Sequence, residues 1–266
     1  MLDSYGRTIN YLRVSVTDRC NLRCTYCMPA EGVPLLRHED ILSFEEILEV
    51  VRAAVALGIR KVRLTGGEPL VRRGIVELVR MLAAIREIRD LSMTTNGTLL
   101  AGLAQPLAEA GLRRVNVSLD AIRPDRYAAI SRGGEVRQAL AGIAAAQQAG
   151  LSPIRLNCVV EHNSRESDAC EVAQFAAKAG LEVRFIRRIG LSEGRFAVVE
   201  GGHGGACSRC NRLRLTSDGA IRPCLLSNLS FPVRKLGPAE ALLQAIRAKP
   251  PAGSACTDRS MNLIGG

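Results

Sequence analysis

Hydrophobic positions along the chain fall into short β-branched runs that alternate with longer stretches of helical spacing. A run at 12–16 precedes a helical pattern that extends to Leu57, and this pattern begins at Ser43 and Glu46 with the spacing of a capping box. The alternation then repeats, which predicts further strands at 61–65, 91–94, 114–118, 154–160 and 183–186 and further helices at 75–85, 99–110, 136–149 and 172–179. Strands that alternate with helices predict a parallel sheet with right-handed crossovers.

Four junctions between a helix and the next strand nearly repeat one another. Each combines a helix end, a glycine turn and the apolar start of a strand, at 56–59, 109–112, 148–151 and 178–181. Six strands in this order predict an α/β fold, a partial (βα)6 TIM-like barrel whose chemistry lies at the carboxyl ends of the strands. The alternation stops after Ile189, so we expect a barrel over 1–189 and a C-terminal region over 190–266 with a Gly-rich loop, a Cys-rich segment and a basic tail.

The composition indicates a globular protein in a reducing compartment. The 266 residues are 47% hydrophobic and 23% charged, which is not typical of disordered chains. No apolar run is long enough to cross a membrane, and the first residues lack the apolar stretch of a signal peptide. We therefore expect a cytoplasmic protein, in which the nine cysteines are metal ligands or reactive thiols rather than disulfides.

The charge balance predicts an anionic ligand. Lys and Arg number 36 against 26 Asp and Glu, a formal net charge of +10, and most of the basic residues are Arg. The chain has no Trp and only nine Phe and Tyr residues together, so it has little material for a base-stacking surface. A compact anion gripped by Arg side chains fits this composition better than a nucleic acid.

The strongest chemical signal is a C-x3-C-x2-C run directly after the first predicted strand, formed by Cys20, Cys24 and Cys27. Three thiolates at this spacing can hold three irons of a [4Fe–4S] cluster and leave the fourth iron open to a small molecule. Zinc is the alternative, but a structural zinc site needs four ligands and no His lies nearby.

The Cys run after the first strand of a βα barrel resembles that of the radical S-adenosylmethionine (SAM) superfamily. Gly66-Gly67-Glu68-Pro69 follows the second strand and matches the element that contacts the methionine amino group in that superfamily. The resemblance implies that the open iron binds the methionine end of SAM and that reduction releases a 5′-deoxyadenosyl radical.

A second group of cysteines has the spacing C-x2-C-x13-C and consists of Cys207, Cys210 and Cys224. The segment between them reads as a strand that runs into a turn, and Arg212 and Arg214 alternate on one of its faces. Taken alone, the group is also typical of half a zinc ribbon, with Cys256 or His203 as the fourth ligand. Two further cysteines fit neither spacing and are expected to be packing residues: Cys158 and Cys170.

Two segments narrow the resemblance to one family. The stretch from Cys207 to Cys224 and the C-terminal double glycine closely resemble the GTP 3′,8-cyclase family of molybdenum cofactor biosynthesis. The resemblance implies a lyase with two [4Fe–4S] clusters and SAM. The radical removes a hydrogen from the ribose C3′ of GTP, and C3′ then attacks C8 of the guanine to give 3′,8-cyclo-7,8-dihydro-GTP. The implied partners are GTP, a reductant or electron-transfer protein, the next enzyme of the pathway and a second copy in a homodimer.

The resemblance also assigns individual residues. It implies that the two Cys groups bind the clusters, the second of which holds the guanine. It implies SAM contacts by Tyr26, Gly66, Gly67, Glu68, Ser118 and Ile189. It implies GTP contacts by Arg13, Arg63, Thr94, Arg155, Arg212 and Arg214. It places four residues in the catalytic machinery: Arg212, Arg214, Gly265 and Gly266.

The chain departs from the family pattern at several positions. Arg155 stands where the family has Lys, Ile189 replaces Met, and 187–188 is Arg-Arg where the family is acidic and aromatic. The connection at 190–206 is several tens of residues shorter than the family's. Two alternatives stay open: a radical SAM enzyme of the same architecture that acts on a peptide or tRNA, and a non-catalytic zinc protein that binds nucleic acid.

Overall fold

The fold is that of a computed structural model, which describes residues 1–190, 194, 196–202 and 204–256. Within these residues the strands form one nine-stranded sheet in the order β6-β5-β4-β3-β2-β1-β7-β8-β9. Neighbouring strands from β6 to β7 are parallel, and β8 and β9 continue the sheet antiparallel. The strands are β1 (Tyr11–Ser15), β2 (Lys61–Thr65), β3 (Asp90–Thr95), β4 (Arg114–Ser118), β5 (Arg155–Val160), β6 (Glu182–Arg187), β7 (Arg212–Leu215), β8 (Ala220–Arg222) and β9 (Phe231–Pro232).

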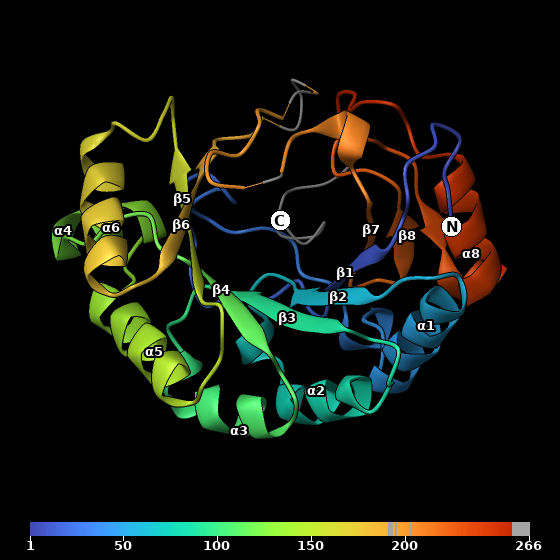
Figure 1. Ribbon diagram of the computed structural model, residues 1–266, viewed down its shortest axis with the longest axis horizontal. Helices are drawn as coiled ribbons and strands as arrows, with labels where there is room; N and C mark the ends of the chain where they lie inside the picture. Colours follow the sequence, from blue (N-terminus) through green and yellow to red (C-terminus); the bar gives the residue numbers. More distant parts are fainter. Residues whose placement is uncertain (191–193, 195, 203, 257–266) are drawn as a thin grey trace.

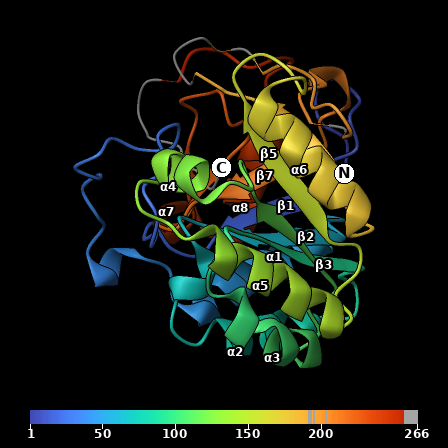
Figure 2. The same ribbon diagram turned by 90° about the vertical axis from the view of Figure 1, so that its left-hand side faces the viewer.

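Figure 1 shows the sheet curved into an arc inside a crescent of helices, which confirms the partial barrel. In the view turned by 90°, the helices again lie on the outer side of the strands (Figure 2). The α-helices are α1 (Phe44–Ala56), α2 (Ile75–Ala83), α3 (Ala104–Glu109), α4 (Pro124–Ser131), α5 (Val136–Gln148), α6 (Ser167–Lys178), α7 (Val233–Leu236) and α8 (Pro238–Arg247). Short 3-10 turns lie at His38–Asp40, Pro69–Val71, Leu100–Gly102 and Cys207–Arg209.

Alternation along the strands separates the core from the interior of the arc. On β1, Leu12 and Val14 are fully buried in the hydrophobic core, whereas Arg13 between them points into the arc. The predicted capping box of α1 is present, since Ser43 Oγ accepts the Glu46 N–H at 3.1 Å and Glu46 Oε2 accepts the Ser43 N–H at 2.7 Å. In the described part of the chain, no helix has the length and apolar character needed to span a membrane.

Three expectations about helices were wrong. The helix predicted at 99–110 is broken into a 3-10 turn and α3, because a continuous helix would put Pro106 in its interior, where the ring collides with the carbonyl of Gly102. Helix α4 was missed, although Pro124 at its first position is typical of a helix start. The tail expected to be merely basic contains α8, which packs against α1.

The C-terminal region extends the barrel sheet. Strand β7 pairs in parallel with β1, with Arg214 opposite Arg13, and Leu213 and Leu215 belong to the same hydrophobic core as the barrel strands. The division between 1–189 and 190–266 therefore marks a change in the sequence pattern, and as a boundary between two domains it stays a prediction.

Candidate active site

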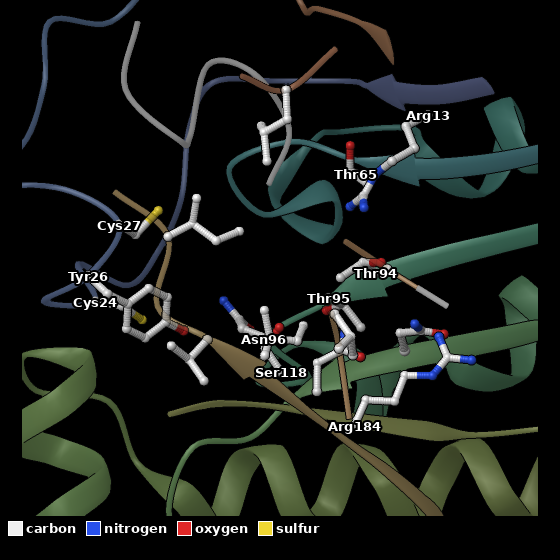
Figure 3. A pocket seen from close by; sticks show the side chains of 18 of the residues that line it. Arg13, Cys24, Tyr26, Cys27, Thr65, Thr94, Thr95, Asn96, Ser118 and Arg184 are labelled. Carbon is white, nitrogen blue, oxygen red and sulfur yellow. The ribbon is translucent and has the colours of Figure 1, made fainter. Parts of the chain in front are cut away.

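One large cavity lies inside the arc and collects most of the expected site residues. Figure 3 shows Cys24 and Cys27 on one side of it and Arg13 and Arg184 on the other, with Thr94 and Ser118 between. The expected residues that line it are Arg13, Cys20, Cys24, Tyr26, Cys27, Arg63, Gly66, Gly67, Glu68, Thr94, Ser118, Ile189, Arg212 and Arg214. The cavity therefore has a sulfur-bearing side and a cationic side.

The first Cys loop is held by polar contacts with neighbouring strand ends. Tyr26 donates its hydroxyl to Asp120 Oδ2 at 2.7 Å, just past β4, and Asn21 donates to Thr98 Oγ1 at 2.9 Å, past β3. Burial raises the pKa of Asp120 to about 6, and burial together with Asp120 raises the pKa of Tyr26 well above its usual value. Tyr26 is therefore a fixed donor that anchors the loop.

The thiols of this loop fit an iron–sulfur cluster better than a single ion. Burial, with Asp120 adding, raises the pKa of Cys24 to about 12, and burial raises the pKa of Cys27 to about 11. Such thiols ionise only when a bound cation compensates the thiolate charge. Among the described residues, no three His, Cys, Asp or Glu side chains converge as ligands of one metal ion. Sulfurs that bind separate irons of a cluster are spaced more widely than the ligands of one ion.

The loop after β2 packs directly onto the loop after β1. Gly67 donates its N–H to Thr17 O at 2.8 Å, and a Cβ on Gly67 would lie 2.3 Å from Arg19 O. Glu68 is buried and accepts the Thr95 hydroxyl and the Asn96 N–H, each at 2.7 Å. Burial raises its pKa to about 7 despite these hydrogen bonds. The two glycines thus permit a close contact, and Glu68 fixes the loop to the end of β3.

The cationic side is a group of arginines on adjacent strands. Arg13 lies opposite Arg63 on β2 and opposite Arg214 on β7. Burial and the charge of Arg214 hold the pKa of Arg13 well below its usual value, and burial with Arg212 lowers the pKa of Arg214 to about 10. Like charges brought together at low exposure favour binding of a polyanion.

The second group of cysteines lines an adjoining cavity, which shares Phe196, Arg212, Arg214 and Leu225 with the first. Burial acts to raise the pKa of Cys210, but the nearby charges of Lys249 and Arg212 bring it to about 7. Lys249 is itself buried and donates to Arg212 O at 2.7 Å and to Pro223 O at 2.5 Å. Cys207, Cys210 and Cys224 are thus gathered beside a fixed positive charge.

Cys256, one of the two candidate fourth ligands for zinc, donates to Ser227 O at 3.6 Å and lies 3.5 Å from Arg222 Nη2. The other, His203, lies outside the described residues.

Similarity to known proteins decides the family. The sequence profile of the Radical SAM superfamily matches residues 14–176. Proteins named GTP 3′,8-cyclase from Moorella thermoacetica and Pelotomaculum thermopropionicum are 42% and 44% identical, with 94% of this chain and 92% and 94% of those proteins covered. The chain belongs to the GTP 3′,8-cyclase family. As a member of the radical SAM superfamily it uses a [4Fe–4S] cluster and SAM.

Solved structures agree on the fold. Streptococcus suis SuiB bound to the precursor peptide SuiA has a TM-score of 0.69 at 14% identity, over 92% of this chain and 66% of that one. The enzyme anSMEcpe with bound AdoMet has a TM-score of 0.64 at 16% identity, over 91% of this chain and 78% of that one. The radical SAM fold is therefore present, and at these identities the likeness extends to the fold alone.

This GTP 3′,8-cyclase family member is shorter than its relatives. The similarity to the GTP 3′,8-cyclase of Alkaliphilus oremlandii, at 38% identity, extends over 322 residues and covers the whole of both chains, although this chain has 266. That relative therefore carries segments that this chain lacks. The assignment of the shortening to 190–206 stays a prediction.

Four expectations about residues need comment. Arg155 is not among the described cavity-lining residues, and its Nε bonds to Glu182 on β6. Gly265 and Gly266 lie outside the described residues. Cys158 is fully buried, as expected of a packing residue, but Cys170 is exposed, because it lies on the solvent side of α6.

Sequence reasoning also missed several cavity-lining residues, among them Thr65, Thr95, Asn96, Asn116, Asn157 and Arg184. The two-residue period of a strand could have found some of them. Arg184 and Ile186 alternate on β6 and both line the cavity, as do Asn116 and Ser118 on β4.

Proposed function

We propose that this protein is a lyase that converts GTP to 3′,8-cyclo-7,8-dihydro-GTP by radical SAM chemistry, the first step of molybdenum cofactor biosynthesis. The observation that carries the proposal is the single cavity with thiols on one side and clustered arginines on the other (Figure 3). Relatives named GTP 3′,8-cyclase at 38–44% identity support the same substrate. A peptide or tRNA substrate is not favoured.

On the sulfur side, Cys20, Cys24 and Cys27 hold the first cluster, which with SAM supplies the 5′-deoxyadenosyl radical when bound. The loop at 66–68 receives the methionine end of SAM, because its glycines leave the backbone accessible at the cavity wall. Tyr26, beside Cys24 on the sulfur side, and Ser118, between the two sides, contact the rest of SAM. Ile189 adds an apolar contact at the rim.

On the cationic side, Arg13, Arg63, Arg212 and Arg214 bind the triphosphate. Each guanidinium presents a planar fork to phosphate oxygens, and a bound polyanion offsets the repulsion within this buried group. Thr94 lines the cavity between the Cys side and the arginines (Figure 3) and contacts the nucleotide. Arg155 adds charge from β5 once its ion pair with the half-exposed Glu182 is broken.

We also propose a second [4Fe–4S] cluster, held by Cys207, Cys210 and Cys224 in the adjoining cavity. The shared wall at Arg212 and Arg214 would bring a guanine in that cavity close to the triphosphate. Iron and acid-labile sulfide analysis tests this point: Cys210→Ser should lose about half of the iron of the reconstituted protein and keep SAM binding. If the second site of the wild-type protein holds zinc instead of iron, the proposal is contradicted.

Turnover tests the function itself. The anaerobic, cluster-reconstituted protein is given SAM, a strong reductant and GTP, and mass spectrometry follows 5′-deoxyadenosine and the cyclised nucleotide. Both products are expected. If 5′-deoxyadenosine forms without cyclised GTP, the radical chemistry stands and the substrate assignment is wrong. The electron donor, the next enzyme of the pathway, the homodimer and the cytoplasmic location stay predictions.

A further inference from the structure

We propose that Asn116 binds a ribose hydroxyl of the nucleotide and so orients the sugar for hydrogen removal. The inference rests on the proposed GTP function and adds a residue to it. Asn116 lies on β4, lines the cavity and is 1% exposed, yet neither Oδ1 nor Nδ2 has a hydrogen-bond partner in the structure. Buried amide groups are almost always paired, so two unpaired atoms at a cavity wall indicate a ligand that completes them.

The neighbouring strand adds a second unpaired group. Thr94 on β3 lies opposite Asn116 in the strand register, it also lines the cavity, and its buried Oγ1 has no partner in the structure. Together the two side chains offer a hydroxyl and an amide, which can both donate and accept. We call Thr94 and Asn116 the polar pair of the cavity.

The chemistry of the surroundings indicates which part of a nucleotide binds to this polar pair. The arginines that line the same cavity, among them Arg13, Arg63 and Arg184, only donate hydrogen bonds, and phosphate oxygens at neutral pH mostly accept them. Asn116 Oδ1 accepts a hydrogen bond and Nδ2 donates one, and a guanidinium-bound phosphate can pair only with Nδ2. A sugar hydroxyl donates and accepts at once, so it satisfies the amide where a phosphate does not.

The strand register gives the position of the polar pair. Arg63 pairs with Arg13 and with Ser92, two residues before Thr94, so Arg13 and Arg63 lie deeper in the barrel than Thr94 and Asn116. Ser118 follows Asn116 by two residues on the same face and lies nearer the Cys loop. The polar pair thus lies between the triphosphate side and the SAM side, where the ribose of GTP must be if its C3′ is to react.

Binding of sugar-modified nucleotides tests the inference without turnover. Cluster-reconstituted wild type, Asn116→Ala and the similarly sized Asn116→Leu are titrated anaerobically, without reductant, with GTP, 2′-deoxy-GTP and 3′-deoxy-GTP. We expect wild type to prefer GTP over at least one deoxy analogue by about tenfold. Both variants should bind GTP about tenfold more weakly and lose that preference, with little change in affinity for the analogue.

Two controls separate this from a damaged fold. Asn163→Ala makes the same chemical change on the exposed loop after β5 and should leave all three affinities unchanged. SAM binding should be retained in both Asn116 variants. If these variants weaken GTP and both deoxy analogues equally, or bind GTP as wild type does, the inference is overturned and the proposed function stands. If wild type binds no GTP, the proposed function falls and the inference falls with it.

Discussion

At the scale of single residues, the active cavity is built from polar groups whose ionisation is set by burial. Glu68 is 1% exposed and is surrounded by donors from β3 and from its own loop. Burial nevertheless dominates and raises its pKa to about 7, well above that of an exposed Glu. The folded protein therefore binds this proton more tightly than the unfolded chain does.

This shift predicts a pH dependence of stability. Because the pKa of Glu68 is raised on folding, its contribution to the free energy of unfolding should fall as the pH rises from about 4.5 to about 7. Glu68→Gln cannot ionise and should remove this slope. The measurement is urea unfolding of wild type and variant across this pH range. Parallel pH profiles for the two proteins would contradict the assignment.

The arginine group predicts a selective loss of substrate binding. Arg214→Ala should raise the KM for GTP at least tenfold, because a buried fork to phosphate is removed from the triphosphate side. Arg214→Lys keeps the charge and loses the fork, so its KM for GTP should lie between those of wild type and Arg214→Ala. Formation of 5′-deoxyadenosine should persist in both variants, since the Cys loop is untouched. Arg137→Ala on the exposed side of α5 is the matched control, and an equal effect there would refute the role.

At the scale of elements, the site depends on how tightly the loops after adjacent strands pack. A Cβ on Gly67 would lie 2.3 Å from Arg19 O, so Gly67→Ala must push apart the loops that hold the Cys run and the SAM contacts. We expect a loss of about 1–3 kcal/mol in the free energy of unfolding and weaker SAM binding. Gly102→Ala, with nothing within 4 Å of its added Cβ, is the control and should change neither. Normal SAM affinity in Gly67→Ala would count against the account.

Many of the helices, strands and Cys runs were predictable from the sequence, because local signals agree with the fold. The capping box at Ser43, the βα alternation and the Cys runs are all read from neighbours in the chain. The parallel pairing of β7 with β1 joins segments about two hundred residues apart and leaves no local pattern. For the same reason the sequence placed Arg214 near the second cysteines but could not place it opposite Arg13. Asn116 could have been inferred from Ser118, two residues later on the same strand face, but nothing in the sequence shows that its amide lacks a protein partner.

At the scale of the whole molecule, the N-terminal segment is tied to residues 249–251 beside the second Cys group. Arg7 is buried, pairs with Asp3 at 2.6 Å, and donates to Cys207 O at 2.9 Å and Pro250 O at 2.7 Å. Lys249 bridges the start of β7 and the end of β8. These buried charges hold the C-terminal region against the barrel.

Removal of this tie should therefore destabilise the molecule. Arg7→Ala leaves Asp3 buried without its ion-pair partner and frees four carbonyls, so we expect a loss of about 3 kcal/mol in the free energy of unfolding. The exposed pair of Arg37 and Asp40 is the control, and Arg37→Ala should cause no measurable loss. Equal stability of the two variants in chemical denaturation would contradict this role of Arg7.

The proposed GTP function places the ribose between the arginines and the SAM side of the cavity. Turnover with GTP deuterated at C3′ tests it directly, with mass spectrometry of the 5′-deoxyadenosine that is formed. We expect the deuterium to appear in 5′-deoxyadenosine together with cyclised product. 5′-Deoxyadenosine that forms with cyclised product yet carries no deuterium would contradict the placement of the ribose.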